Sequence, residues 1–145
     1  MNKSQRQSAT TIVSFALVAP MFFFLVFAIS EGARVFNAYV IITNEAREAA
    51  RYGAVHYDAS QTPAAQQTAI YNYLMQRLSG SVDQSQLLPA PAITVTPGTT
   101  SPFTEPTVDV TVSYRIQLII PMISAVLPNP FPIQARSIMV GEPGS

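Results

Sequence analysis

Residues 12–29 read IVSFALVAPMFFFLVFAI, and this stretch decides how the chain is organised. It contains no charged side chain. At about 1.5 Å of rise per residue, its 18 positions would cover roughly 27 Å as a helix, close to the roughly 30 Å hydrocarbon thickness of a bilayer. The stretch therefore predicts a membrane-spanning helix over about residues 12–30.

The helical pattern continues beyond the apolar run. Between residues 31 and 52 the chain has no proline, and apolar residues recur at steps of four, three, four and three. These residues are Val35, Tyr39, Ile42, Ala46 and Ala49. Such spacing places them on one face of a helix. We therefore expect one long helix over residues 10–53, ended by Gly53, with residues 1–9 as a short cytoplasmic tail or leader.

The remaining residues, 54–145, predict a small extracytoplasmic domain. Thr62 and Pro63 resemble an N-cap and a first-turn proline, and they would open a second helix that ends at Leu78. Strand patterns occupy residues 92–96, 108–118 and 133–140, and the middle one alternates strictly between apolar and polar side chains. Residues 97–106 read as a plain surface connection, and the proline-bounded residues 120–132 as a long apolar connection. The prediction is an α+β fold with a three-stranded antiparallel sheet.

The two apolar patterns predict how the domain packs. One apolar face belongs to the long helix and carries Val35, Tyr39, Ile42 and Ala46, and the other belongs to the middle strand. Each face would be costly to leave in water, at about 25 cal/mol per Å². We therefore expect them to pack against each other.

Composition excludes several classes of function. Only 11% of the residues are charged and the net charge is zero, so the chain lacks the basic surface that binds nucleic acid. It has no cysteine and a single histidine, His56, which we interpret as structural or solvent-exposed. No phosphate-binding loop or nucleophile elbow is present. The sequence predicts no enzyme activity, no catalytic residue, no cofactor and no metal site.

Three motifs suggest a family. VSFALVAP at residues 13–20, ISEGAR at 29–34 and TNEAREAARY at 43–52 occur in an order and spacing that resembles the TadE-like family of pilin-related, or pseudopilin, proteins. The strand sequences VTVSY and IQARSIM are also similar to that family. The chain departs from the family pattern at Ser14, where the family has a glutamate, and at Ala9, which is usually glycine.

The resemblance implies a pilin-like structural subunit of a tight-adherence type IV pilus, in a major, minor or tip position. Its partners would be other pilin subunits, a prepilin peptidase, an inner-membrane platform with its assembly ATPase, and membrane lipid. The peptidase would cut between Ala9 and Thr10. Because Ser14 lacks the carboxylate that would attract a neighbour's new amine, cleavage is an open question.

Several residues of the first helix are candidates for packing between subunits. Pro20 should kink or open the helix, and small residues allow close helix approach. The candidates are Phe15, Ala16, Pro20, Phe22, Phe23, Gly32 and Arg34.

Two alternatives are also compatible with the sequence. Lys3 and Arg6 ahead of the apolar run favour an N-terminus in the cytoplasm and a domain outside, but they also suit a signal peptide cut near Ser30. The second alternative is a membrane-anchored binding or adhesion protein.

Overall fold

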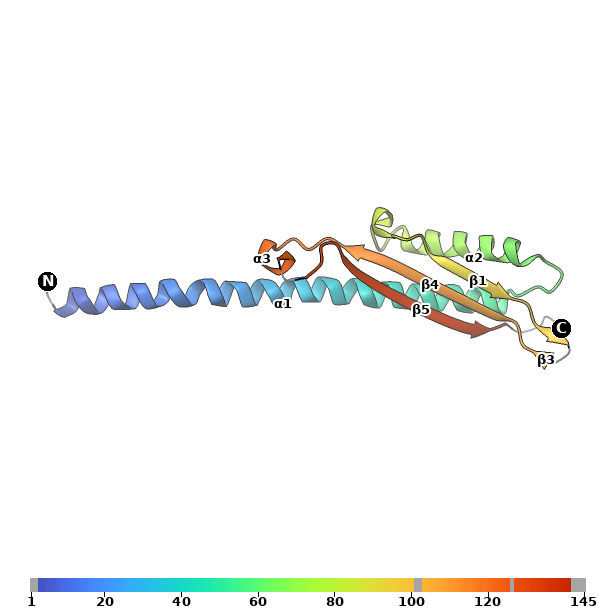
Figure 1. The fold of residues 1–145 in the computed structure, drawn as a ribbon, viewed down its shortest axis with the longest axis horizontal. Helices are drawn as coiled ribbons and strands as arrows, with labels where there is room; N and C mark the ends of the chain where they lie inside the picture. The colour runs from blue at the N-terminus through green and yellow to red at the C-terminus, as the bar shows by residue number, and fades with distance from the viewer. Residues whose placement is uncertain (1–2, 101–102, 126, 142–145) are drawn as a thin grey trace.

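A computed structural model describes residues 3–100, 103–125 and 127–141, with the backbone alone at residues 3–10, 99–100, 103 and 122. Its longest element is α1 (Lys3–Val55), a helix of 53 residues. The N-terminal half of α1 projects from the domain, and the C-terminal half is part of it (Figure 1). The helix continues through Pro20.

The other elements follow in the predicted order, and the α+β prediction is confirmed. Thr62 caps the second helix by accepting from the N–H of Ala65. The strands after the helices agree with the predicted ranges to within two residues at each end. The elements are α2 (Pro63–Leu78), η1 (Gln84–Gln86), β1 (Ala92–Thr96), β2 (Thr99–Thr100), β3 (Phe103–Thr104), β4 (Thr107–Ile116), α3 (Pro121–Ser124) and β5 (Phe131–Val140).

Three of the strands form an antiparallel sheet in the order β1-β4-β5. Val95 pairs with Val108 across β1 and β4, and Val112 pairs with Ala135 across β4 and β5. Because side chains alternate along a strand, this register collects the apolar side chains on one face. The residues expected to form a plain connection, 97–106, include a small antiparallel pair of β2 with β3.

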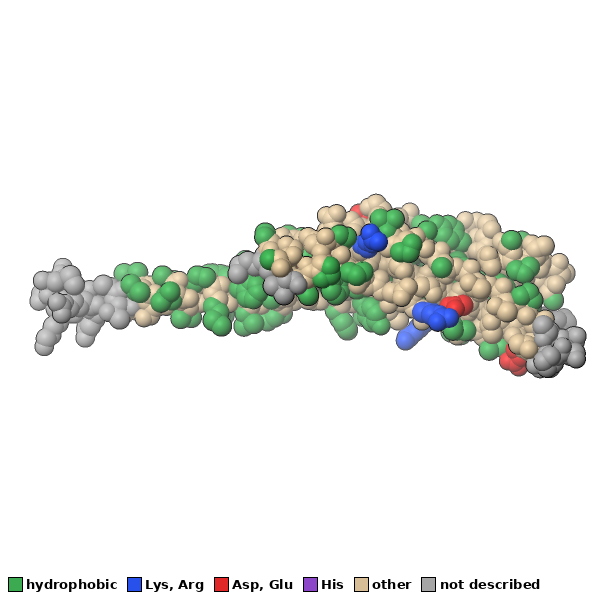
Figure 2. All heavy atoms as spheres, in the orientation of Figure 1, with side chains coloured by type: hydrophobic (Ala, Val, Ile, Leu, Met, Phe, Trp, Pro, Cys, Tyr) green, Lys and Arg blue, Asp and Glu red, His purple; other side chains and the backbone are tan. Residues whose placement is uncertain are grey.

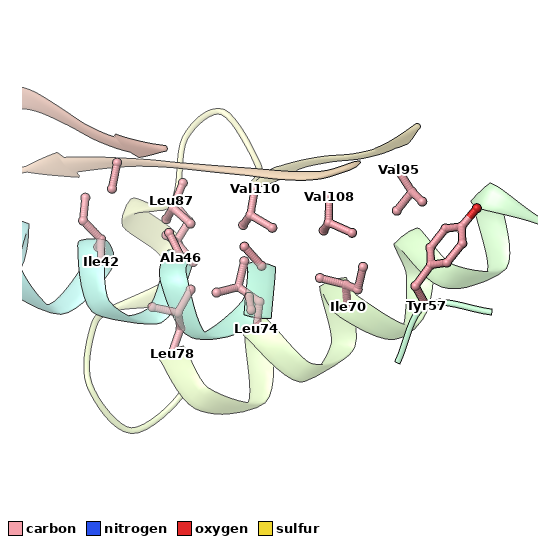
Figure 3. Packing of buried hydrophobic residues seen from close by; sticks show 14 residues of the cluster. Ile42, Ala46, Tyr57, Ile70, Leu74, Leu78, Leu87, Val95, Val108 and Val110 are labelled. Atoms are coloured by element: carbon pink, nitrogen blue, oxygen red, sulfur yellow. The ribbon is translucent and has the colours of Figure 1, made fainter. Parts of the chain in front are cut away.

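The core lies between this face and two helices. In Figure 3, α1 and α2 lie side by side beneath β4 and β1, so the domain has a layer of helices and a layer of sheet. Ile42, Leu74, Leu78, Val108, Val110 and Val112 are the largest fully buried side chains. Burying each is worth about 1.5–3 kcal/mol.

The predicted contact between α1 and β4 is confirmed at one end only. Ile42 and Ala46 are completely buried, whereas Tyr39 is 44% exposed. Tyr39 lies closer to the N-terminal end of α1, where the inner face of the sheet gives way to the segment after β4. The expectation that Tyr39 is a core residue is therefore wrong.

The predicted end of α1 at Gly53 is also wrong, because the helix continues to Val55. Gly53 is buried, and an added Cβ would lie 2.5 Å from Cδ1 of Ile70 and 2.9 Å from Cγ1 of Val108. The glycine therefore allows α1 to approach α2 and the sheet.

Candidate functional site

The N-terminal half of α1 is an unburied apolar surface. Every large apolar side chain that the structure describes from Ile12 to Phe27 is between 38% and 77% exposed. In Figure 2, the coloured part of this half shows apolar side chains and no charged side chain before the domain begins. Among the described residues, α1 is the one helix long and apolar enough to cross a membrane. It is consistent with a membrane anchor.

The residues predicted for subunit packing lie on this surface or just beyond it. Phe15, Phe22 and Phe23 are exposed, as are Ala16, Pro20 and Gly32. Within this set, the rings of Phe22 and Phe23 meet edge to face at 6.0 Å, and Phe23 stacks on Phe27 at 6.4 Å. An added Cβ at Gly32 would have no atom within 4 Å.

The residues predicted for leader cleavage lie at the start of the same helix. Ser14 is exposed. Ala9 and Thr10 are part of α1, but their side chains lie outside the described part of the chain. The geometry thus brings no other described element to this region.

An apolar groove of about 630 Å³ lies where the bare half of α1 meets the domain. One wall is a stripe along α1, and the other is the segment from the end of β4 to the start of β5. The helix contributes Phe24, Ala28, Glu31, Gly32, Val35, Phe36 and Tyr39, and the other wall contributes Leu118, Ile123, Leu127, Phe131 and Ile133.

A buried carboxylate lies in this otherwise apolar groove. Glu31 is only 4% exposed. Nη1 of Arg34 donates to its Oε1 at 2.8 Å, and the backbone N–H of Ile119 approaches the same oxygen at 3.5 Å. In the sequence, Glu31 and Arg34 are an oppositely charged pair three residues apart on a helix, and this spacing does not indicate that the carboxylate is buried. The available signal was the position of Glu31, directly after a charge-free run and one turn before an arginine.

Comparison with known proteins identifies this helix. Residues 9–51 match the model of the family described as TadE-like protein. The long helix is TadE-like. The match covers all the residues predicted for cleavage and subunit packing, and it leaves α2 and the sheet outside. No curated protein and no solved structure matches the chain.

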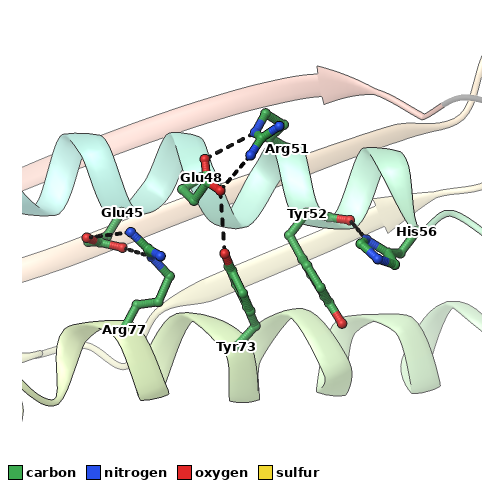
Figure 4. Close-up of polar contacts among 7 residues, drawn as sticks. All are labelled: Glu45, Glu48, Arg51, Tyr52, His56, Tyr73 and Arg77. Carbon is green, nitrogen blue, oxygen red and sulfur yellow. Dashed lines mark hydrogen bonds and ion pairs between the residues drawn. The ribbon is translucent and has the colours of Figure 1, made fainter.

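The C-terminal part of the TadE-like helix is joined to α2 by stacked rings (Figure 4). Tyr52 and Tyr73 stack face to face at 4.2 Å, with 6° between their planes. On its other side, Tyr52 stacks on His56 at 4.3 Å, and Nδ1 of His56 lies 2.9 Å from the carbonyl oxygen of Tyr52. His56 therefore takes part in the packing at the end of the helix.

Ion pairs flank the stacked rings. Nη2 of Arg51 donates to Oε1 of Glu48 at 2.8 Å, and this hydrogen bond lowers the pKa of the Glu48 carboxyl. Between the two helices, Arg77 of α2 donates to Glu45 of α1, and this hydrogen bond raises the pKa of the arginine. These partly exposed ion pairs lie within α1 and between α1 and α2, an arrangement that suits helix association. No group of three or more metal-ligating side chains occurs in the described part of the chain.

Proposed function

We propose that this protein is a structural subunit of a tight-adherence type IV pilus. It is anchored by one transmembrane helix before assembly and packs through that helix in the filament. The single observation that carries the proposal is that the TadE-like match falls on the helix whose described large apolar side chains from Ile12 to Phe27 remain exposed. An apolar helix of this kind is stable in lipid or in a bundle of similar helices, and unstable in water.

The domains follow from the anchor. Residues 1–9 would be a cytoplasmic tail or leader, residues 12–30 the span, and residues 54–145 an extracytoplasmic domain on the outer side of the inner membrane. Lys3 and Arg6 on the short N-terminal side support this orientation. Partners would be other pilin subunits, the prepilin peptidase, and the membrane platform with its ATPase.

Ser14 suggests a terminal, minor or unprocessed position for the subunit. A carboxylate in an apolar bundle is costly unless it is paired, so a chain without one needs no charge-matched neighbour. Replacing Ser14 by glutamate should improve cleavage between Ala9 and Thr10, seen as loss of the mass of residues 1–9 when the peptidase is co-expressed. Complete cleavage of the wild type with no effect of Ser14→Glu would contradict this role.

Disulfide trapping tests subunit packing directly, because the chain has no cysteine of its own. Ala16→Cys places a thiol on the exposed span, and Gln76→Cys places one on the exposed side of α2 as a matched control. We expect oxidised dimers and higher species from Ala16→Cys in membranes and in sheared pili, and monomers from Gln76→Cys. Equal cross-linking of both variants, or of neither, would contradict packing through the helix.

Gly32 offers a second test that leaves the monomer intact. Because nothing lies within 4 Å of an added Cβ there, Gly32→Leu should fold normally and yet obstruct close approach of a neighbouring helix. Normal pilus number and length in a strain carrying Gly32→Leu would count against contact at this position.

The alternative of an exported, cleaved protein makes a different prediction. The continuity of α1 across residues 28–30 argues against a cut there, since the helix that would begin at Glu31 is half of a packed element. If the measured intact mass equals that of a chain beginning at Glu31, the result would support export of a soluble protein.

A further inference from the structure

The segment between β4 and β5 comprises residues 117–130, of which residue 126 lies outside the described part, and its described residues are the part of the domain nearest the N-terminal half of α1 (Figure 1). We call it the apolar loop. The chain carries no charged side chain between Arg115 and Arg136. Ile119 is 69% exposed and Leu127 is 43% exposed, although both are large and apolar.

The apolar loop lies beside the last turns of the predicted membrane span, and not only beyond the end of the span. Ile123 and Leu127 lie around the groove together with Phe24 and Ala28 of α1. Phe24 precedes Ser30, the end of the charge-free run, by six positions, which corresponds to roughly 9 Å along a helix. Membrane-surface segments bury their apolar faces by about 5–10 Å. If α1 spans the bilayer, part of the apolar loop lies at acyl-chain depth.

The backbone of the apolar loop is suited to such a position. Exposed N–H groups are costly in hydrocarbon, so a segment that enters it must satisfy them internally. The loop meets part of this requirement with its own turns and with side chains. Donors bonded within the protein are the N–H groups of Leu118, Ile119, Ile123, Ser124, Ala125 and Leu127. Positions without an N–H are Pro121, Pro128 and Pro130.

Two polar side chains complete this arrangement at the base of the loop. Oδ1 of Asn129 accepts from the N–H of Leu118 at 3.0 Å, and its Nδ2 donates to the carbonyl of Leu118 at 3.2 Å. Glu31 accepts from Arg34, whose side chain remains 47% exposed. If residues 12–30 span the bilayer, this charged pair lies just beyond the span, where headgroups and water are available.

We propose that the apolar loop inserts into the leaflet on the domain's side of the membrane, with acyl chains filling the groove beside α1. This inference rests on the membrane anchor of the proposed function, and it adds a second point of membrane contact. Two contacts fix the tilt of the domain on the membrane, which a single helix leaves free to rotate.

Tryptophan scanning tests the proposal, because the chain contains no tryptophan. Single variants Leu127→Trp and Ile119→Trp report on the apolar loop in the full chain. Phe23→Trp reports on the span, and Ile138→Trp, on a side chain 55% exposed on β5, serves as the matched control. Each variant is reconstituted into phosphatidylcholine vesicles whose acyl chains carry bromine, and iodide is added as an aqueous quencher.

We expect bromine to remove most of the emission of Leu127→Trp, Ile119→Trp and Phe23→Trp, while Ile138→Trp is quenched by iodide only. Iodide quenching of both loop variants, with Phe23→Trp still quenched by bromine, would overturn insertion and leave the anchor standing. Protection of both loop variants from both quenchers would also overturn insertion. In that case a second copy of the protein, and not lipid, would cover the groove. Failure of bromine to quench Phe23→Trp would reject the membrane anchor itself.

Discussion

Gly53 of α1 lies so close to Ile70 of α2 that a Cβ on the glycine would come within 2.5 Å of the isoleucine Cδ1. The two helices and β4 meet at this point, because Cγ1 of Val108 would be 2.9 Å from the same Cβ. The helix crossing therefore depends on the absence of a side chain at one position.

Gly53→Ala should destabilise the domain. Overpacking a core costs about 1–3 kcal/mol, which exceeds the gain of about 0.5–1 kcal/mol from replacing glycine by alanine in a helix. Gly32→Ala in the same helix is the control, since its Cβ meets nothing within 4 Å and only the gain applies. Thermal unfolding in detergent micelles measures both. A melting temperature of Gly53→Ala at or above that of Gly32→Ala would contradict the close approach.

Ile42→Asp should unfold the domain, whereas Tyr39→Asp should leave it folded. Ile42 is completely buried, so an aspartate there is a charge without a partner in the core, while Tyr39 is 44% exposed and can present a carboxylate to water. Circular dichroism of both full-length variants in micelles distinguishes the two. Equal loss of structure would place Tyr39 in the core after all.

Arg34→Met should cost more stability than Glu31→Gln. The arginine variant leaves the buried Glu31 carboxylate without its charged partner, a loss of about 1–3 kcal/mol or more, whereas glutamine is neutral and can still accept from Arg34 and Ile119. Free energies of unfolding in micelles, with the double variant to complete a cycle, measure the coupling. The reverse order of costs would mean that the pair contributes little.

Asp58 should make the wild type lose stability in acid. The hydroxyl and backbone N–H of Ser60 donate to its Oδ1 at 2.6 and 2.8 Å, and they lower its pKa below the ordinary 3.8. Because the folded-state pKa is depressed, the contribution is complete above the ordinary pKa and is lost as pH falls through the folded one. The advantage of wild type over Asp58→Asn should therefore be constant near neutral pH and shrink below about pH 4. An advantage that does not change with pH would contradict the assignment.

The sequence predicts most of the fold because its periodicities are long and consistent. The alternation of β4 and the helical spacing around Ile42 each repeat over several turns or pairs, so local pattern and tertiary packing agree. The predicted end of α1 failed at Gly53 because a glycine required for close approach reads in the sequence like one that ends a helix. The prediction that Tyr39 is buried failed because burial depends on how far the sheet extends along α1. The length of the sheet has no local signal in the sequence around Tyr39.

The candidate site was predictable only in part. The charge-free run of residues 12–29 marks the bare helix by composition alone. The groove is formed by residues about ninety positions apart, such as Glu31 and Leu118, whose meeting depends on where the connection after β4 folds back. Neither residue carries a pattern that points to the other.

The unbroken course of α1 from its bare half into the core has a mechanical consequence. No linker separates the two halves. Tension applied at the N-terminal end therefore passes along the helix axis directly to the seam, by which we mean the packed contact between α1, α2 and the sheet. That seam runs lengthwise along the helix, so the load acts on it as shear, spread over Ile42, Ala46, Ala49 and Gly53 together. A force that peeled the sheet away from its edge would instead break these contacts one after another.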